Sequence, residues 1–100
     1  MENEVTISFE DLERALHLAL NAIREFNGGG GRATFSHNYF WSVSGDELFE
    51  VESVPRELTI GQVSGSIRNL DGILSGEDIP IPHHLIWIAE ILKAYGHEAA

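Results

Sequence analysis

The sequence predicts an α+β fold: an N-terminal helix, an antiparallel β-hairpin and then two helices, of which the C-terminal one is central. Apolar residues first recur every three or four positions, which is the period of a helix. Over residues 33–54 they alternate with polar residues, as in a strand. Helical spacing returns over 60–74 and 85–96. One hundred residues suffice for one core, so we expect a single domain, residues 1–100.

The composition is that of an acidic globular protein. Sixteen Asp and Glu residues against six Lys and Arg give a net charge of −10, which repels nucleic-acid phosphates and anionic lipid surfaces. The absence of cysteine excludes disulfides and thiol catalysis. The acidic N-terminus is unlike a secretory signal, and no apolar run approaches the ~20 residues of a membrane span. We therefore expect a cytoplasmic protein that binds neither nucleic acid nor membrane.

The N-terminal helix has the clearest pattern. Val5 and Ile7 alternate with polar residues and predict a short edge strand before it. Ser8 with Asp11 three residues later predicts the helix start. The apolar stripe that follows consists of Leu12, Leu16, Ala19, Ile23 and Phe26. Asn27 and Gly28–Gly31 then predict a cap and a flexible connector, because a phosphate-binding glycine loop opens a helix whereas this run closes one.

The alternating stretch predicts a hairpin with an aromatic face. A three-residue loop, Ser44 to Asp46, would pair Trp41 with Phe49 and Tyr39 with Val51. That register places the apolar residues on one face and Glu50 on the other. A two-residue loop would mix apolar and acidic residues on both faces, so we favour the three-residue loop.

A second helix is predicted over 60–74, begun by a capping box of Thr59 and Gln62. Its apolar residues are spaced three and four apart, although it contains Gly61, Gly65 and Gly72, each of which costs about 1 kcal/mol relative to alanine. Close packing against another element explains such glycines, and a helix loose enough to move is the alternative.

The last helix is predicted over 85–96, read LIWIAEILKAYG. Two neighbouring apolar stripes are interrupted only by Glu90 and Lys93, which indicates a helix covered on two sides. A proline-containing linker places Pro82 at its first position, and Gly96 is expected to end it.

Histidines on this helix are weak candidates for a metal site. The candidate ligands are His83, His84, Glu90 and His97. Residues seven positions apart lie about 10.5 Å apart along a helix, so one helix cannot bring His83, Glu90 and His97 onto one ion. A shared site would need a second helix or subunit. The alternative is that His83 and His84 are helix-start residues, and that His97 interacts with the negative end of the helix dipole.

Acidic residues gather on the predicted hairpin and its exit: Asp46, Glu47, Glu50, Glu52 and Glu57. Only Arg56 opposes them locally. Catalytic carboxylate pairs need a buried member and a cleft, so we interpret this cluster as a solvated face that could steer a basic protein partner. No catalytic residue and no cofactor is predicted.

Two segments carry a resemblance. LTIGQVSGSIRNL, residues 58–70, and LIWIAEILKAYG, residues 85–96, follow an aromatic hairpin, as in small acidic bacterial proteins of uncharacterised function. The resemblance covers residues 39–96. It implies a bacterial cytosolic origin and no catalytic residue.

We predict a non-enzymatic protein-interaction module, because the aromatic residues of so small a chain cannot all point inward. It would form a homodimer or bind a basic protein partner. The predicted interaction surface consists of Tyr39, Trp41, Glu50, Glu52 and Trp87. The alternative is a small metal-dependent enzyme or metal sensor that uses the histidines at a subunit interface.

Overall fold

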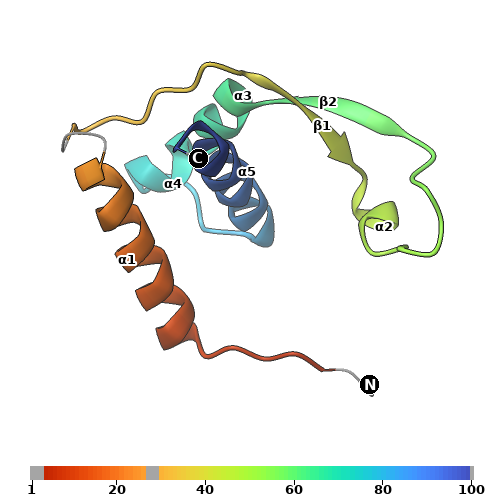
Figure 1. The fold of residues 1–100 in the computed structure, drawn as a ribbon, viewed down its shortest axis with the longest axis horizontal. Helices are drawn as coiled ribbons and strands as arrows, with labels where there is room; N and C mark the ends of the chain where they lie inside the picture. Colours follow the sequence, from red (N-terminus) through yellow and green to blue (C-terminus); the bar gives the residue numbers. More distant parts are fainter. Residues whose placement is uncertain (1–3, 27–29, 100) are drawn as a thin grey trace. The chain divides into compact units, whose positions relative to one another are not determined.

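A computed structural model describes residues 4–26 and 30–99 of the chain (Figure 1). The chain divides into two compact units, Met1–Ala33 and Thr34–Ala100. The first contains helix α1, and the second contains a two-stranded antiparallel sheet and helices α2 to α5. The α+β class predicted from the sequence is confirmed.

The first unit is built on α1, Phe9–Phe26. The Asp11 amide donates to Ser8 Oγ over 3.0 Å, which confirms the predicted start. The edge strand predicted around Val5 and Ile7 is wrong, because residues 4–8 form no strand. A strand needs a neighbour for its backbone hydrogen bonds, and pairing among the described residues is confined to the two strands of the second unit. The cap predicted at Asn27 and Gly28 lies outside the described residues.

The hairpin pairs different segments from those predicted. β1, Tyr39–Val43, runs antiparallel to β2, Leu58–Gln62. The return strand predicted at Phe49 and Val51 is therefore wrong. Helix α2, Gly45–Leu48, follows β1 instead. Asp46 and Glu47 lie in its first turn, where negative side chains stabilise a helix.

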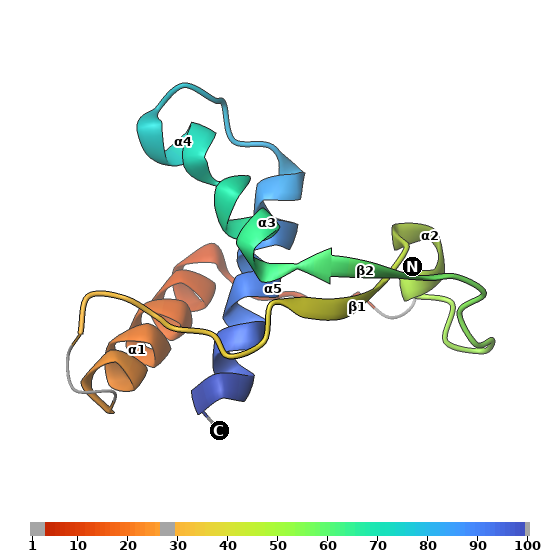
Figure 2. The ribbon, with the colours of Figure 1, turned by 90° about the horizontal axis from the view of Figure 1, so that it is seen from above.

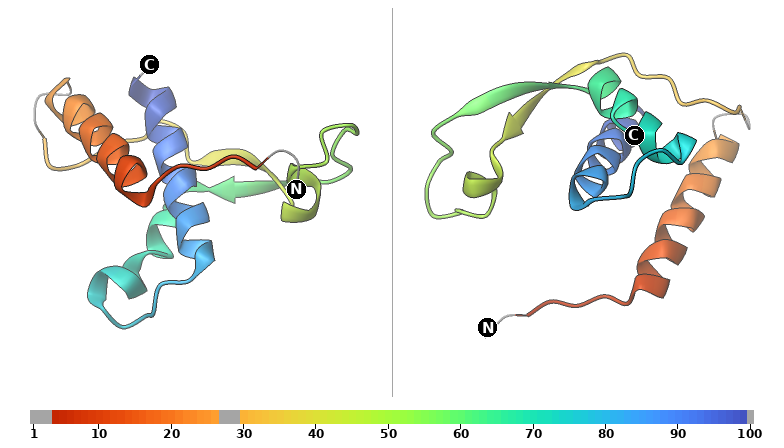
Figure 3. Two further views of the ribbon diagram at one scale, coloured as in Figure 1. Left: turned by 90° about the horizontal axis from the view of Figure 1, so that it is seen from below. Right: turned by 180° about the vertical axis from the view of Figure 1, so that it is seen from behind.

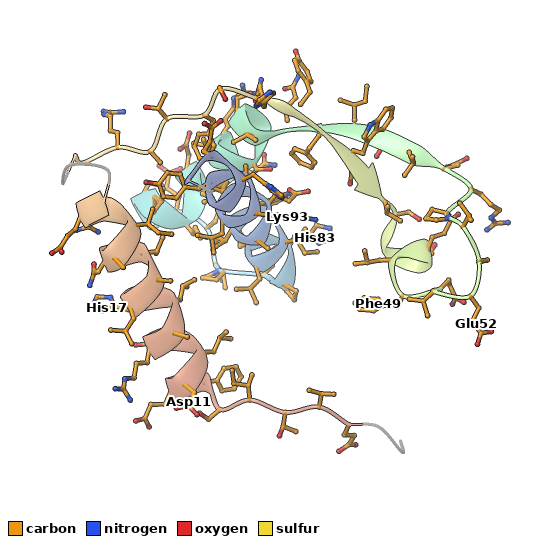
Figure 4. The ribbon with its side chains drawn as sticks, viewed as in Figure 1. Asp11, His17, Phe49, Glu52, His83 and Lys93 are labelled. Atoms are coloured by element: carbon orange, nitrogen blue, oxygen red, sulfur yellow. The ribbon has the colours of Figure 1, made fainter. Side chains whose placement is uncertain are left out.

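The connection between the strands is closed by an ion pair. Both oxygens of the Glu47 carboxylate accept hydrogen bonds from Arg56, one from its backbone amide at 2.5 Å and one from Nε at 3.3 Å. This contact joins α2 to the residues just before β2. Phe49 and Glu52 lie at the end of the hairpin that is furthest from α5 (Figure 4).

The single helix predicted over 60–74 is also wrong. Its first residues belong to β2, and the rest form α3, Val63–Arg68, and α4, Asp71–Ser75. The predicted capping box fails because Thr59 is a strand residue. Asn38 caps α3 instead: its carbonyl accepts the Val63 amide at 2.7 Å, and its Oδ1 accepts the Ser64 amide at 2.8 Å.

Helix α5, Pro82–Ala99, is the central helix of the second unit and packs against α3 (Figures 2 and 3). The start predicted at Pro82 is confirmed. The end predicted at Gly96 is wrong, since the helix continues to Ala99. Cover on two sides is also wrong at the N-terminal end, because Leu85 is 70% and Ile86 is 50% exposed.

Few side chains are buried. Among the described residues, Val63 is the one buried apolar side chain, and Ser66 and His84 are the buried polar ones. In the described part of the chain, no helix combines the length and apolar character that crossing a bilayer requires.

Candidate protein interface

The hairpin has one uncharged face that is largely apolar, which we call the outer face. Successive side chains of a strand point to opposite sides, so alternate positions of the paired strands share a face. The outer face consists of Tyr39, Trp41, Val43, Leu58, Ile60 and Gln62. The exposed fractions of its large side chains are 65% for Tyr39, 70% for Trp41, 52% for Leu58 and 64% for Ile60. The structure therefore leaves a contiguous apolar surface in contact with solvent.

The opposite face, which we call the inner face, is closely packed at one point. Phe40 pairs with Gly61 in the sheet register. The ring of Phe40 lies over Gly61, in the space that a β-carbon at position 61 would occupy. Glycine is therefore needed here to let an aromatic ring approach the neighbouring backbone.

A groove of about 740 Å³ lies between β1 and α5. Its apolar lining includes Phe40, Leu48, Ile86 and Ala89, and the outer-face residues of β1, Tyr39, Trp41 and Val43, border it as well. The charged groups and His97 come from α5 and are joined by polar residues at or before β1: Glu90, Lys93, His97 and Glu98, with Ser36, His37 and Ser42. Figure 4 shows His83 and Lys93 extending from the same side of α5.

The chain entering β1 is fastened to the last turn of α5 at one end of this groove. Glu98 Oε1 accepts the Ser36 amide at 2.5 Å and the Ser36 hydroxyl at 2.6 Å. These hydrogen bonds, and more weakly the nearby His37, hold the pKa of Glu98 below its usual value of 4.5. Phe35 meets Tyr95 edge to face, with 6.0 Å between ring centres. These contacts fix residues 34–38 along α5.

One polar contact joins α3 to α5, and a second closes the start of α5 itself. The Ser66 hydroxyl donates to Glu90 Oε1 over 2.9 Å, which joins α3 to α5. At the start of α5, His84 Nδ1 accepts the Ile81 amide at 2.9 Å, while the His84 amide donates to the Ile81 carbonyl at 3.0 Å. The side-chain bond is one half of a capping box, with histidine as the third helical residue, and the backbone carbonyl of Ile81 takes the place of the usual N-cap side chain. The sequence did not indicate this contact, because the usual residue at that position is Glu or Gln.

The metal candidates lie apart within the chain. His83 and His84 lie in the first turn of α5, as the helix-start interpretation predicts, and both rings contact Trp87. Glu90 accepts from Ser66, and His97 lines the groove. Over residues 4–26 and 30–99, no three His, Asp or Glu side chains are grouped so that they could hold a metal ion. A site shared with a second subunit stays a prediction.

The predicted interaction residues fall into three places. Tyr39 and Trp41 lie together on the outer face. Trp87 is partly buried beside the two histidine rings. Glu50 and Glu52 are exposed in the connection between α2 and β2, so the prediction that Glu50 lies on a strand is wrong.

The second half of the outer face, Leu58 and Ile60, was not predicted from the sequence. Alternation of these residues with Thr59 and Gly61 was the available signal for a strand. The helical spacing from Ile60 onward concealed it. Comparison with protein-family models, curated proteins and solved structures found no match to this chain.

Proposed function

We propose that this protein is a non-enzymatic protein-interaction module and that the outer face of its hairpin is the contact surface. One observation carries the proposal: four large apolar side chains of that face are each more than half exposed. With fully exposed areas of roughly 150–250 Å² each, they present on the order of 500 Å² of surface. This matches the largest apolar patches of ordinary monomers, ~300–600 Å², which are often functional.

The engagement of the groove carboxylates supports a binding role over a catalytic one. Glu90 accepts a hydrogen bond from Ser66, and Glu98 accepts two from Ser36. Both carboxylates join one segment of the fold to another. A general acid or base would need to be available to a substrate instead.

The acidic connection adds a long-range electrostatic component to the proposal. Within residues 44–57, Arg56 is the one cation, and it pairs with Glu47. The other acids there are Asp46, Glu50, Glu52 and Glu57. Such a cluster would accelerate the approach of a basic partner and slow that of an acidic one, and either effect would fall as salt rises.

Affinity capture with a matched pair of variants tests the proposal. Ile60 and Thr59 are adjacent, exposed strand residues on opposite faces of the sheet. Ile60→Glu therefore places a charge on the outer face, and Thr59→Glu places the same charge on the inner face. We expect tagged wild type and Thr59→Glu to retain the same bound protein and Ile60→Glu to lose it. Equal retention by both variants would refute the outer face as the contact surface.

A further inference from the structure

We infer that the partner of the outer face is a second copy of this chain, bound through its own outer face. The inference rests on the proposed function and names the partner for the same surface. Each protomer would supply one sheet, and the two sheets would pack face to face. A two-stranded hairpin is marginal alone and gains stability from a second layer on its apolar face.

The distribution of charge supports self-association. The protein carries a net charge of −10, which by itself makes two copies repel one another. None of that charge lies on the outer face, whose six positions are apolar or uncharged. A basic partner would find no carboxylate there, whereas an identical neutral face is complementary to it. The acids of the hairpin lie beyond the paired strands, in residues 44–57.

The geometry of the face suits a two-fold axis. Trp41 and Ile60 form the middle pair of the register, flanked by Tyr39 with Gln62 and by Val43 with Leu58. A two-fold axis through the centre of the face therefore places Trp41 and Ile60 of both copies in the middle of the interface. A large aromatic residue at the centre is the usual position of a binding hot spot.

The available area is also sufficient. The four large side chains offer on the order of 500 Å² per copy, so two copies would bury about 1,000 Å², the area at which specific interfaces begin. An interface at this lower limit predicts a reversible dimer whose population depends on protein concentration.

Sedimentation equilibrium of the full chain is the first test, over concentrations from about 1 to 100 µM. We expect wild type and Thr59→Glu to approach twice the monomer mass of 11.1 kDa. Ile60→Glu should raise the dissociation constant by at least ~10-fold, with an unchanged circular dichroism spectrum. Added salt should tighten the wild-type dimer, because it screens repulsion between like-charged copies. A wild-type protein that stays monomeric over the whole range overturns the inference.

Photo-crosslinking in host lysate separates failure of this inference from failure of the proposed function. A photo-reactive phenylalanine analogue replaces Ile60, and the same analogue at Thr59 is the control. The inference is supported if the analogue at position 60 cross-links two copies of the chain and the analogue at position 59 does not. If the analogue at position 60 cross-links only to a different protein, the inference of a second copy is overturned, but the proposed function as an interaction module is retained. If the yield of cross-links at position 60 is no greater than the yield at position 59, both the inference and the proposed function are overturned.

Discussion

The contact between α3 and α5 and the outer face of the hairpin use side chains in opposite ways. Of the three buried side chains in the described part of the chain, which lie on α3 and α5, two are polar, Ser66 and His84, and each makes a hydrogen bond. On the outer face, by contrast, the largest apolar side chains remain exposed. Protein interiors normally show the reverse distribution. The chain thus holds itself together largely through specific local contacts and leaves much of its apolar surface available for association.

This difference predicts that adding atoms on the inner face disturbs the fold more than removing the same number from the outer face. Gly61→Val should destabilise the second unit by about 2–3 kcal/mol, because the new side chain would overlap the ring of Phe40. Ile60→Ala, one residue earlier, should cost less than ~1 kcal/mol in dilute monomer, since exposed positions contribute little. Urea denaturation followed by tryptophan fluorescence measures both values.

Gly45→Ala is the matched control for the glycine substitution. A β-carbon at Gly45 meets no other atom within 4 Å, so this variant should unfold at nearly the wild-type urea concentration. If Gly61→Val were as stable as Gly45→Ala, the close packing of Phe40 on the sheet would be refuted.

The start of α5 should depend on hydrogen bonding more than on apolar area. His84→Ala removes a buried ring and the acceptor for the Ile81 amide, and it should cost about 2 kcal/mol, because the ring leaves a cavity and the amide loses its partner. His84→Gln keeps an acceptor at the third helical position and should recover at least half of that loss. The same denaturation measurement compares the two variants. Equal stability of the two would show that ring packing against Trp87, rather than the hydrogen bond, is what His84 contributes.

The sequence was most informative where structure depends on neighbours along the chain. Ser8 and Asp11 mark the start of α1 because they form a hydrogen bond between residues three positions apart. Pro82 marks the first residue of α5 because its missing amide is harmless there. Tyr39 and Trp41 share the outer face because strand residues alternate, whichever strand is their partner. Each of these features follows from local geometry alone.

The sequence was misleading where a distant residue decides the local structure. The spacing of Ile60, Val63 and Ile67 fits a helix. Residues 58–62 form strand β2 instead, because they pair with β1. Asn38 then determines where α3 begins, by accepting the amides of Val63 and Ser64. Alternation over residues 58–61 indicates a strand but not its partner, and no spacing places Asn38 beside Val63. Half of the outer face was missed for the same reason, because its Leu58 and Ile60 belong to that misassigned strand.

We expect the smallest change in stability from breaking the hydrogen bonds between Ser36 and Glu98. These bonds lie outside both the α3–α5 contact and the outer face. Hydrogen bonds from Ser36 lower the pKa of Glu98, so the ionised carboxylate is favoured in the folded state. A lowered pKa means that this stabilisation is present above the unfolded value near 4.5 and is lost as the pH falls through the folded value. Glu98→Gln should therefore be less stable than wild type at neutral pH, and the difference should shrink below pH 4.5.

Urea unfolding of wild type and Glu98→Gln at a series of pH values measures this difference. Glu77→Gln removes one charge from an exposed position and controls for the change in net charge. Exchange of the Ser36 amide with solvent gives a local reading, and it should accelerate in Glu98→Gln at neutral pH only. A stability difference that is the same at every pH would mean that the ionised form of Glu98 is not what holds Ser36. In that case residues 34–38 would depend on the ring contact between Phe35 and Tyr95 instead.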